Sequence, residues 1–331
     1  MLEVALDTSP LAQTRAGTAR YLRGLLGALK HEPAVHVQRL AFGARPRLAV
    51  PVRDVGWYLG VLPLLARSAD VLHCPTFRAP VRSGVPLVVT FHDLAVLRHP
   101  EAFNAWTRAY SRALLPRVAR AAARLIAVSE FTAQELIDVL GVPERKIRVI
   151  PNAVGEPFTA EGDAAEGEYV LAVGTLEPRK NLSRLVEGFR RAGLNGCELR
   201  IVGARGWGNV DPVAADGVRW LGEVSDDDLA RLYRGARCAA YVSLYEGFGL
   251  PVLEAMACGT AVVSSDLPAV REFAGGVVTV DPRDPDSIAS GLTEALGRRE
   301  ELGHEGREAA AAFDWPRIAR KTVEVYREVA A

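Results

Sequence analysis

This sequence lacks an excess of charge of either sign, closely spaced cysteines and any apolar run long enough to cross a membrane. Its 331 residues include 40 Lys and Arg against 40 Asp and Glu. No overall field therefore favours nucleic acid or an anionic surface, and such a partner would need a local basic patch. The four cysteines lie in apolar segments without the spacing of metal ligands, as buried thiols in a reducing compartment do. These absences predict a cytoplasmic protein that does not bind nucleic acid.

Neither a secretion signal nor a membrane-spanning helix is predicted. Residues 1–7 carry an acid where a signal peptide carries bases, and their apolar run is too short for a signal core. The most apolar later stretch, residues 57–66, is interrupted by Pro63 and is far shorter than a bilayer requires. Peripheral contact with the inner face of a membrane stays compatible with the sequence.

The chain does contain enough apolar material for two packed domains. Hydrophobic residues make up 49% and charged residues 24%, which is typical of a globular protein. Apolar, β-branched runs alternate with helix-length segments on both sides of residues 151–167, which are rich in Pro, Gly and acids. This alternation predicts parallel sheets, so we expect an α/β fold of two Rossmann-like, doubly wound domains. The expected strands are residues 1–7, 37–42, 69–74, 86–91, 124–128, 147–150, 169–174, 199–203, 218–221, 238–242, 261–264 and 277–280.

The aperiodic segment sets the expected domain boundary. We predict an N-terminal domain at residues 1–152, a second domain at 153–313 and a last helix at 314–331. Ligands of open parallel sheets bind beyond the carboxyl ends of the strands, where the strand order switches. With two such sheets facing each other, we expect the ligand site in a central cleft.

A glycine-rich segment after the strand at 238–242 opens a helix with Pro251 in its first turn. The first turn of a helix leaves backbone N–H groups unpaired, and these form a site for an anion or a hydroxyl. Two carboxylates nearby can accept hydrogen bonds from sugar hydroxyls. The groups concerned are the amides of Phe248, Gly249 and Leu250 and the side chains of Glu246 and Glu254. A plain helix start with two exposed acids is the structural alternative.

A second segment, residues 174–182, leaves the strand at 169–174 and places Arg179 beside Lys180 at a turn. A departing diphosphate needs its charge neutralised. Without a metal that task falls to Arg, which binds oxyanions bidentately, and to Lys, a mobile point charge. Taken alone, such a pair is more typical of a solvated helix end.

Together the two segments resemble the signature of the retaining GT-B glycosyltransferases of family 4, also called group 1. The string Gly-Thr-Leu-Glu-Pro-Arg-Lys-Asn and the pair Glu246 and Glu254, separated by seven residues, stand in the family's relation to each other. The resemblance implies transfer of a hexose from a nucleoside diphosphate sugar. It assigns Glu246 to hexose hydroxyls, Glu254 to the ribose, and Arg179 and Lys180 to the leaving diphosphate. It also implies that the last helix crosses back to the first domain.

The resemblance extends to the first domain. His92 ends the strand at 86–91, where a histidine is by itself more often structural, but many family members use one there to contact the transferred sugar. Residues 93–94 and 98–101 resemble mannosyltransferase-like members, which favours GDP-mannose over UDP-hexoses as donor. The family's paired glycines after the first strand are absent, and only Gly17, followed by Thr18, stands in that region as a candidate acceptor or phosphate loop. The remaining predicted donor-binding residues are Gly174, Thr175, Gly203 and Val224.

No metal or cofactor is expected. No Asp-x-Asp triplet directly follows a strand, and residues 226–228 lie behind Ser225 as acids at a helix start do. Five arginines between residues 104 and 124 favour a solvated face over a site for anionic lipid or a phosphorylated acceptor. The acceptor is a hydroxyl of a glycan, a lipid-linked saccharide or a small molecule, and the sequence does not predict the oligomeric state. The competing functions are a non-catalytic nucleotide-sugar-binding partner subunit and an epimerase or phosphorylase on the same fold.

Overall fold

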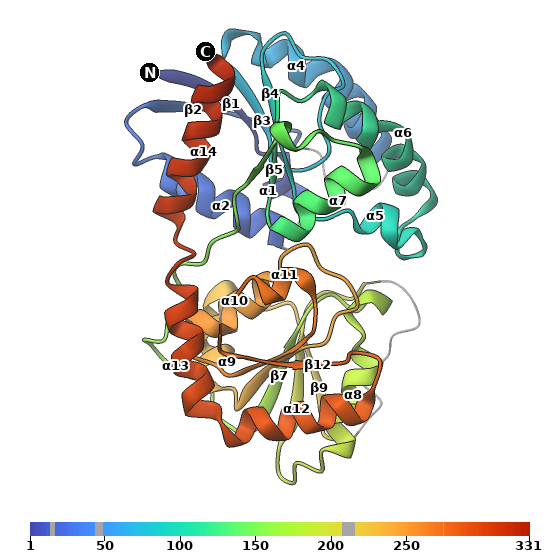
Figure 1. Ribbon diagram of the computed structural model, residues 1–331, viewed down its shortest axis with the longest axis vertical. Coiled ribbons are helices and arrows are strands. Elements are labelled where there is room, and N and C mark those ends of the chain that lie inside the picture. The colour runs from blue at the N-terminus through green and yellow to red at the C-terminus, as the bar shows by residue number, and fades with distance from the viewer. Residues whose placement is uncertain (14–16, 44–48, 207–215, 274) are drawn as a thin grey trace. The chain divides into compact units, whose positions relative to one another are not determined.

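The computed structural model describes residues 1–13, 17–43, 49–206, 216–273 and 275–331. Its contacts divide the chain into two compact units (Figure 1). The first unit consists of Met1–Ala153 together with Asp314–Ala331, and the second consists of Val154–Phe313. Within the described residues, no helix combines the length and the apolar character that crossing a membrane requires.

The first unit is built on a six-stranded parallel sheet in the order β2-β1-β3-β4-β5-β6. Alternate residues of its strands enter two different cores, as a sheet buried on both faces requires. Val71 and Val88 pack with the helices at the chain's two ends, whereas their neighbours Leu72 and Val89 pack into the other core. Its strands are β1 (Leu2–Asp7), β2 (Val35–Leu40), β3 (Val71–Cys74), β4 (Leu87–Phe91), β5 (Arg124–Ala127) and β6 (Ile147–Val149).

Helices cover both faces of this sheet. In chain order they are α1 (Ser9–Gln13), α2 (Gly17–Leu29), α3 (Ala49–Pro51), the π-helix Val52–Val61, α4 (Leu62–Leu65), α5 (Ala95–Arg98), α6 (Ala105–Ala121), α7 (Glu130–Leu140) and α14 (Trp315–Ala330). The apolar stretch at residues 57–66 is therefore helical, and Pro63 falls in the first turn of α4, directly after the π-helix. Arg124, the last of the five arginines and the first residue of the expected strand at 124–128, begins β5 and pairs with Glu328 at 2.6 Å.

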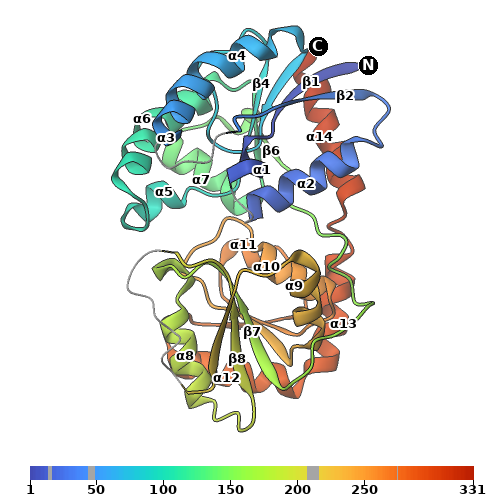
Figure 2. The same ribbon diagram turned by 180° about the vertical axis from the view of Figure 1, so that it is seen from behind.

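The second unit repeats the architecture with the sheet order β12-β11-β10-β7-β8-β9, again parallel throughout. Its strands are β7 (Tyr169–Val173), β8 (Glu198–Val202), β9 (Val218–Gly222), β10 (Cys238–Tyr241), β11 (Val262–Ser265) and β12 (Val277–Val280). Its helices are α8 (Leu182–Arg191), α9 (Asp226–Gly235), α10 (Leu250–Ala257), α11 (Pro268–Arg271), α12 (Pro285–Gly297) and α13 (Arg299–Ala310). The view from behind shows α8 and α12 on the opposite side of this sheet from α9 and α10 (Figure 2).

The order of strands reverses once in each sheet. In the first unit β1 lies between β2 and β3, and in the second β7 lies between β8 and β10. The connections that follow the two strands at such a switch run to opposite faces, which leaves a crevice beyond their carboxyl ends where ligands bind. Ligand sites are therefore expected at the segments after β1 and β3 and at those after β7 and β10.

The C-terminal helix α14 is fastened to the first sheet by a buried polar chain. His73 on β3 hydrogen-bonds the hydroxyl of Tyr326 at 2.7 Å through Nδ1 and that of Thr90 at 2.9 Å through Nε2. Burial, with the charge of His92 as a smaller cause, lowers the pKa of His73 to about 3. His73 is therefore neutral at pH 7, and α14 is held by directional bonds as well as by apolar packing.

The fold confirms the α/β prediction strand by strand. Each expected strand is present, with ends displaced by no more than two residues. The division by contacts falls after Ala153 and places Asp314–Ala331 with the first unit.

Candidate functional site

The switch between β7 and β10 brings two distant turns together in the second unit. The turn after β7 ends in a short 3-10 helix, Pro178–Lys180, followed by Asn181 in the left-handed conformation with φ of 59°. The Asn181 side chain donates to the carbonyl of Val242 at 3.0 Å and to that of Pro282 at 2.6 Å. These bonds hold the turn against the end of β10, because Asn tolerates left-handed backbone better than other residues with side chains.

The two cations of that turn meet the carboxylate that follows β10. Lys180 Nζ and Arg179 Nη1 each lie 2.7 Å from Glu246 Oε1. Arg179 also donates to the carbonyl of Tyr245 at 2.7 Å and to Glu177 Oε1 at 2.6 Å. Lys180 donates to the hydroxyl of Tyr241 at 3.1 Å. Two carboxylates thus face two cations, and all four side chains are largely enclosed.

The environment of Glu246 keeps its carboxylate ionised. Burial raises its pKa, but the charges of Lys180 and Arg179 and their hydrogen bonds outweigh burial and bring the pKa to about 2. A carboxylate in this state accepts hydrogen bonds and donates none. Glu246 is therefore suited to hold hydroxyl groups and unsuited to act as a general acid near pH 7.

Beside Glu246 the helix α10 begins without a side-chain cap. Gly249 precedes it with φ of 102°, a conformation that favours glycine. No described residue accepts a hydrogen bond from the N–H of Phe248, Gly249 or Leu250. Phe248 packs edge-on against Phe273, with ring centroids 5.0 Å apart, which fixes the turn. The helix start therefore presents free donors, the arrangement that binds anions and hydroxyl oxygens.

The other predicted donor-binding residues follow neighbouring strands of the same sheet or lie on α10. A Cβ on Gly203, after β8, would lie 2.0 Å from the carbonyl oxygen of Gly174, after β7, so the two backbones touch. Thr175 and Val224 are half-buried, and Val224 follows β9. Glu254 lies buried on α10, where the Tyr233 hydroxyl donates to it at 3.4 Å.

The remaining candidates belong to the first unit. His92 follows β4, and its Nε2–H donates to the carbonyl of Pro75 at 3.0 Å, which leaves Nδ1 as an acceptor. Burial lowers its pKa, against the opposing effects of the Pro75 bond and Asp93. The ring of Tyr21 on α2 meets the imidazole edge-on at 4.9 Å. Gly17 and Thr18 are the first residues of α2.

In the described part of the chain, no three His, Cys, Asp or Glu side chains are arranged to hold a metal ion. The acids at 226–228 start α9, and Ser225 caps that helix by accepting from the N–H of Asp228 at 3.0 Å. All four cysteines are unpaired. Sequence reasoning missed Glu177 and Tyr241 as partners of the cations; an acid two residues before Arg179 was the available signal for the first.

Comparison with known proteins identifies the family. A model described as glycosyl transferases group 1 matches residues 167–298, and one described as glycosyltransferase family 4 matches residues 16–155. An O-antigen chain mannosyltransferase B of Escherichia coli is 32% identical over 282 residues, which cover 78% of this chain and 74% of that protein. The chain belongs to glycosyltransferase family 4. The group 1 match contains Arg179, Lys180 and both glutamates, and the family 4 match contains His92.

Solved structures confirm the GT-B fold of this family 4 member. A sucrose-phosphate synthase from Thermosynechococcus elongatus superimposes with a TM-score of 0.79 at 19% identity, covering 99% of both chains. Anabaena HepE in complex with UDP and glucose superimposes with a TM-score of 0.78 at 17% identity, covering 99% of this chain and 100% of that one.

Proposed function

We propose that this chain is a retaining, metal-independent hexosyltransferase that uses a nucleoside diphosphate sugar. The observation that carries the proposal is the convergence of Arg179, Lys180 and Glu246 at the strand switch of the second unit, beside the unpaired N–H groups of α10. Cations and helix-start amides suit a diphosphate, and an ionised carboxylate suits sugar hydroxyls. Membership of the family supports both assignments.

In the proposed reaction the acceptor hydroxyl attacks the anomeric carbon from the face by which the diphosphate leaves. The new glycosidic bond forms as the bond to the diphosphate breaks, and a phosphate oxygen of the leaving group takes the hydroxyl proton. Arg179 and Lys180 neutralise the charge that develops on the diphosphate, and the amides of residues 248–250 add to this stabilisation. Glu246 and His92 contact the hexose, and Glu254 contacts the ribose. No protein nucleophile takes part.

The ion pairs of Glu246 with Arg179 and Lys180 give this carboxylate a second role in the proposal. A diphosphate that binds Arg179 and Lys180 competes with the Glu246 carboxylate for the same donors. Glu246 then exchanges ion-pair contacts for hydroxyl contacts with the hexose. Binding of the two halves of the donor is thereby coupled, because the diphosphate frees the carboxylate that the sugar needs.

For the donor we propose GDP-mannose, and for the acceptor a hydroxyl of a glycan, a lipid-linked saccharide or a small molecule. The E. coli relative named a mannosyltransferase supports the sugar and a place in polysaccharide biosynthesis. The complex of HepE with UDP and glucose supports the general class of donor, while its nucleotide makes the UDP-hexoses the second candidates.

Incubation with GDP-, UDP-, ADP- and dTDP-sugars, a mixture of acceptor glycans and excess EDTA tests this function. We expect one donor to release its nucleoside diphosphate at an unchanged rate with and without the chelator, and NMR of the product to show the anomeric configuration of the donor. Saturable donor binding without turnover would favour the non-catalytic partner subunit. An inverted product, or loss of turnover with EDTA, contradicts the retaining or the metal-independent mechanism respectively.

We propose peripheral contact with a membrane at the cytoplasmic face, through an apolar surface of the first unit. The large apolar side chains Val52, Val55, Val61, Leu64 and Leu65 are 46 to 60% exposed along the π-helix and α4. The double change Leu64→Gln and Leu65→Gln leaves the charge unaltered while removing apolar area. We expect it to lower co-sedimentation with anionic phospholipid vesicles about fivefold or more. Equal sedimentation of the variant and the parent, or none by the parent, contradicts this contact.

A further inference from the structure

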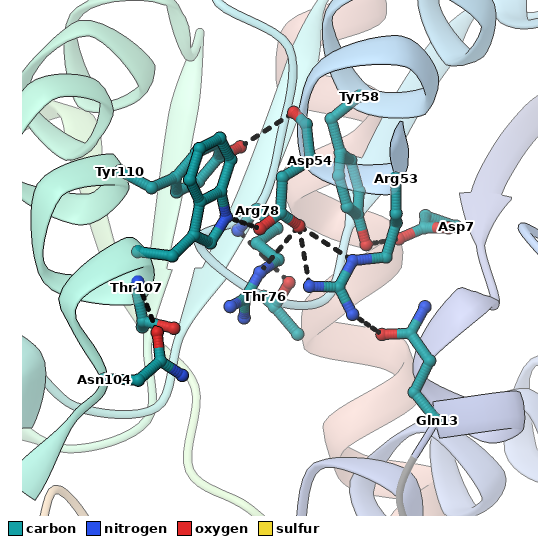
Figure 3. A network of polar contacts seen from close by, with 11 residues as sticks. Asp7, Gln13, Arg53, Asp54, Tyr58, Thr76, Arg78, Asn104, Thr107 and Tyr110 are labelled. Carbon is teal, nitrogen blue, oxygen red and sulfur yellow. Dashed lines mark hydrogen bonds and ion pairs between the residues drawn. The ribbon is translucent and has the colours of Figure 1, made fainter. Parts of the chain in front are cut away.

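A second polar cluster lies in the first unit, around a carboxylate that takes no part in the proposed chemistry. Asp54, on the π-helix, is fully buried. Its Oδ1 accepts from Arg53 Nε at 2.7 Å and from Arg78 Nε at 3.2 Å, and its Oδ2 accepts from Trp106 Nε1 at 3.0 Å. The guanidinium groups of Arg53 and Arg78 both turn toward this carboxylate (Figure 3).

The cluster holds two positive charges against one negative charge. The side chains of Arg53 and Arg78 are only 12 and 22% exposed, so the extra charge is largely removed from water. Asp7, another buried acid of this unit, is engaged elsewhere, since it accepts from Ser9 and from the hydroxyl of Tyr58 at 3.0 Å. Residues 14–16 and 44–48, outside the described part of this unit, contain arginine and no acid. Enclosed charge of this kind favours binding of an anion.

Arg78 has both Nη groups to spare, whereas every guanidinium nitrogen of Arg53 already has a partner. Arg53 directs Nε and Nη2 to Asp54 and Nη1 to Gln13 Oε1 at 2.6 Å. Arg78 touches Asp54 through Nε alone, and no described residue accepts from its Nη1 or Nη2. The Nη edge of a guanidinium is the edge that grips an oxyanion with two parallel hydrogen bonds. Asp54 therefore orients Arg78 while leaving that edge open.

The cluster lies in the part of the fold where open parallel sheets bind their ligands. Arg78 follows β3 and Gln13 ends the helix after β1, so both lie beyond the carboxyl ends of the two strands at the switch of this sheet. Gln13 supplies a second open donor, because its buried Nε2 has no hydrogen-bond partner among the described residues. The hydroxyl of Thr76, in the same connection as Arg78, accepts from the Arg78 N–H at 3.2 Å and fixes the turn.

We propose that Arg78 binds an oxyanion on the acceptor, a phosphate or a carboxylate, and that Asp54 and Arg53 position it. This inference rests on the proposed transferase function and narrows its acceptor to an anionic one. It separates the two anion sites of the protein: the donor diphosphate belongs to the second unit, and the acceptor anion to the first.

The test compares probes that differ only in the anionic group. Binding of methyl mannoside 6-phosphate, methyl mannuronate as the free acid and neutral methyl mannoside is measured by ligand-observed NMR on the full chain. GDP is titrated separately by calorimetry. We expect the parent to bind at least one anionic probe about tenfold more tightly than the neutral one. The preferred probe decides between phosphate and carboxylate.

Three variants test whether Arg78 causes the tighter binding of the anionic probe. Arg78→Gln is expected to abolish it, and Arg78→Lys to keep part of it together with the contact to Asp54. Arg82→Gln is the matched control, because Arg82 is an exposed arginine of the same connection and the charge change is the same. We expect all three to bind GDP as the parent does. Equal binding of all probes by the parent, an equal loss in Arg82→Gln, or weakened GDP binding in Arg78→Gln overturns the proposal.

The donor assay keeps this proposal distinct from the transferase itself. Donor turnover by a parent that shows no preference for anionic probes contradicts the acceptor site alone. Absence of nucleotide binding and turnover contradicts the proposed function instead.

Discussion

Replacing Arg179 by Ala is expected to lower kcat of sugar transfer about 100- to 1,000-fold, the usual cost of removing one group that stabilises developing charge. The guanidinium lies 2.7 Å from Glu246, beside Lys180, and no other arginine among the described residues touches this carboxylate. KM for the donor is expected to change much less, because the loss falls on the charge of the departing diphosphate. Steady-state release of nucleoside diphosphate measures both constants.

Two further variants separate chemistry from folding in this experiment. Arg190→Ala, at an exposed position of α8, makes the same change in charge and is expected to leave kcat unaltered. Arg179→Lys restores the charge without the bidentate geometry and is expected to recover activity only in part. Thermal melting of each variant checks the fold, since Arg179 also bonds Glu177 and the carbonyl of Tyr245. Unaltered turnover by a folded Arg179→Ala protein would contradict the proposed role of Arg179 in stabilising the departing diphosphate.

The largest expected effect on stability is that of Asp54→Asn. The change keeps the shape of the side chain but leaves two enclosed guanidinium groups without a counter-charge. Removing one partner of a buried ion pair costs about 3 kcal/mol or more in the free energy of unfolding. Urea unfolding at pH 7 measures this loss. Asp138→Asn, at an exposed position of α7 in the same unit, is expected to change stability by less than about 0.5 kcal/mol.

A double-mutant cycle shows whether charge is the cause. Combining Arg78→Gln with Asp54→Asn removes one of the two guanidinium groups that Asp54→Asn leaves without a counter-charge. The free energy of unfolding of the double variant is therefore expected to fall by about 1 kcal/mol less than the sum of the two single losses. Strict additivity would mean that Asp54 stabilises the fold through its other partners, such as Trp106.

The fold could be predicted from the sequence because strands buried on both faces form continuous apolar runs. β3 and β4 are buried at every position, and both were expected within two residues of their observed ends. The ends moved because a strand stops where its pairing with a neighbour stops, which depends on partners distant in the chain. Hydrophobic periodicity carries no information about those partners.

Contacts between residues distant in the chain also decide which site residues could be predicted. Arg179, Lys180 and Glu246 were found through the motifs of the family, although Lys180 and Glu246 stand 66 positions apart and meet only because β7 lies beside β10. The Asp54 cluster belongs to no quoted motif, and Arg78 and Trp106 come to it from 24 and 52 positions away. The signal in the sequence was a single acid at the start of a long apolar stretch, where an unpartnered charge would be costly.

The return of α14 to the first unit has a consequence for synthesis on the ribosome. Residues 154–313 form one continuous stretch, and the N–H of Val154 bonds the carbonyl of Phe313 at 2.9 Å, so the second unit closes on itself. The first unit needs Ile318, Val323 and Tyr326 to complete its core. Because domains tend to fold as they are made, the second unit can finish while the first still waits for its last helix. The half of the protein that is made first is the half that is completed last.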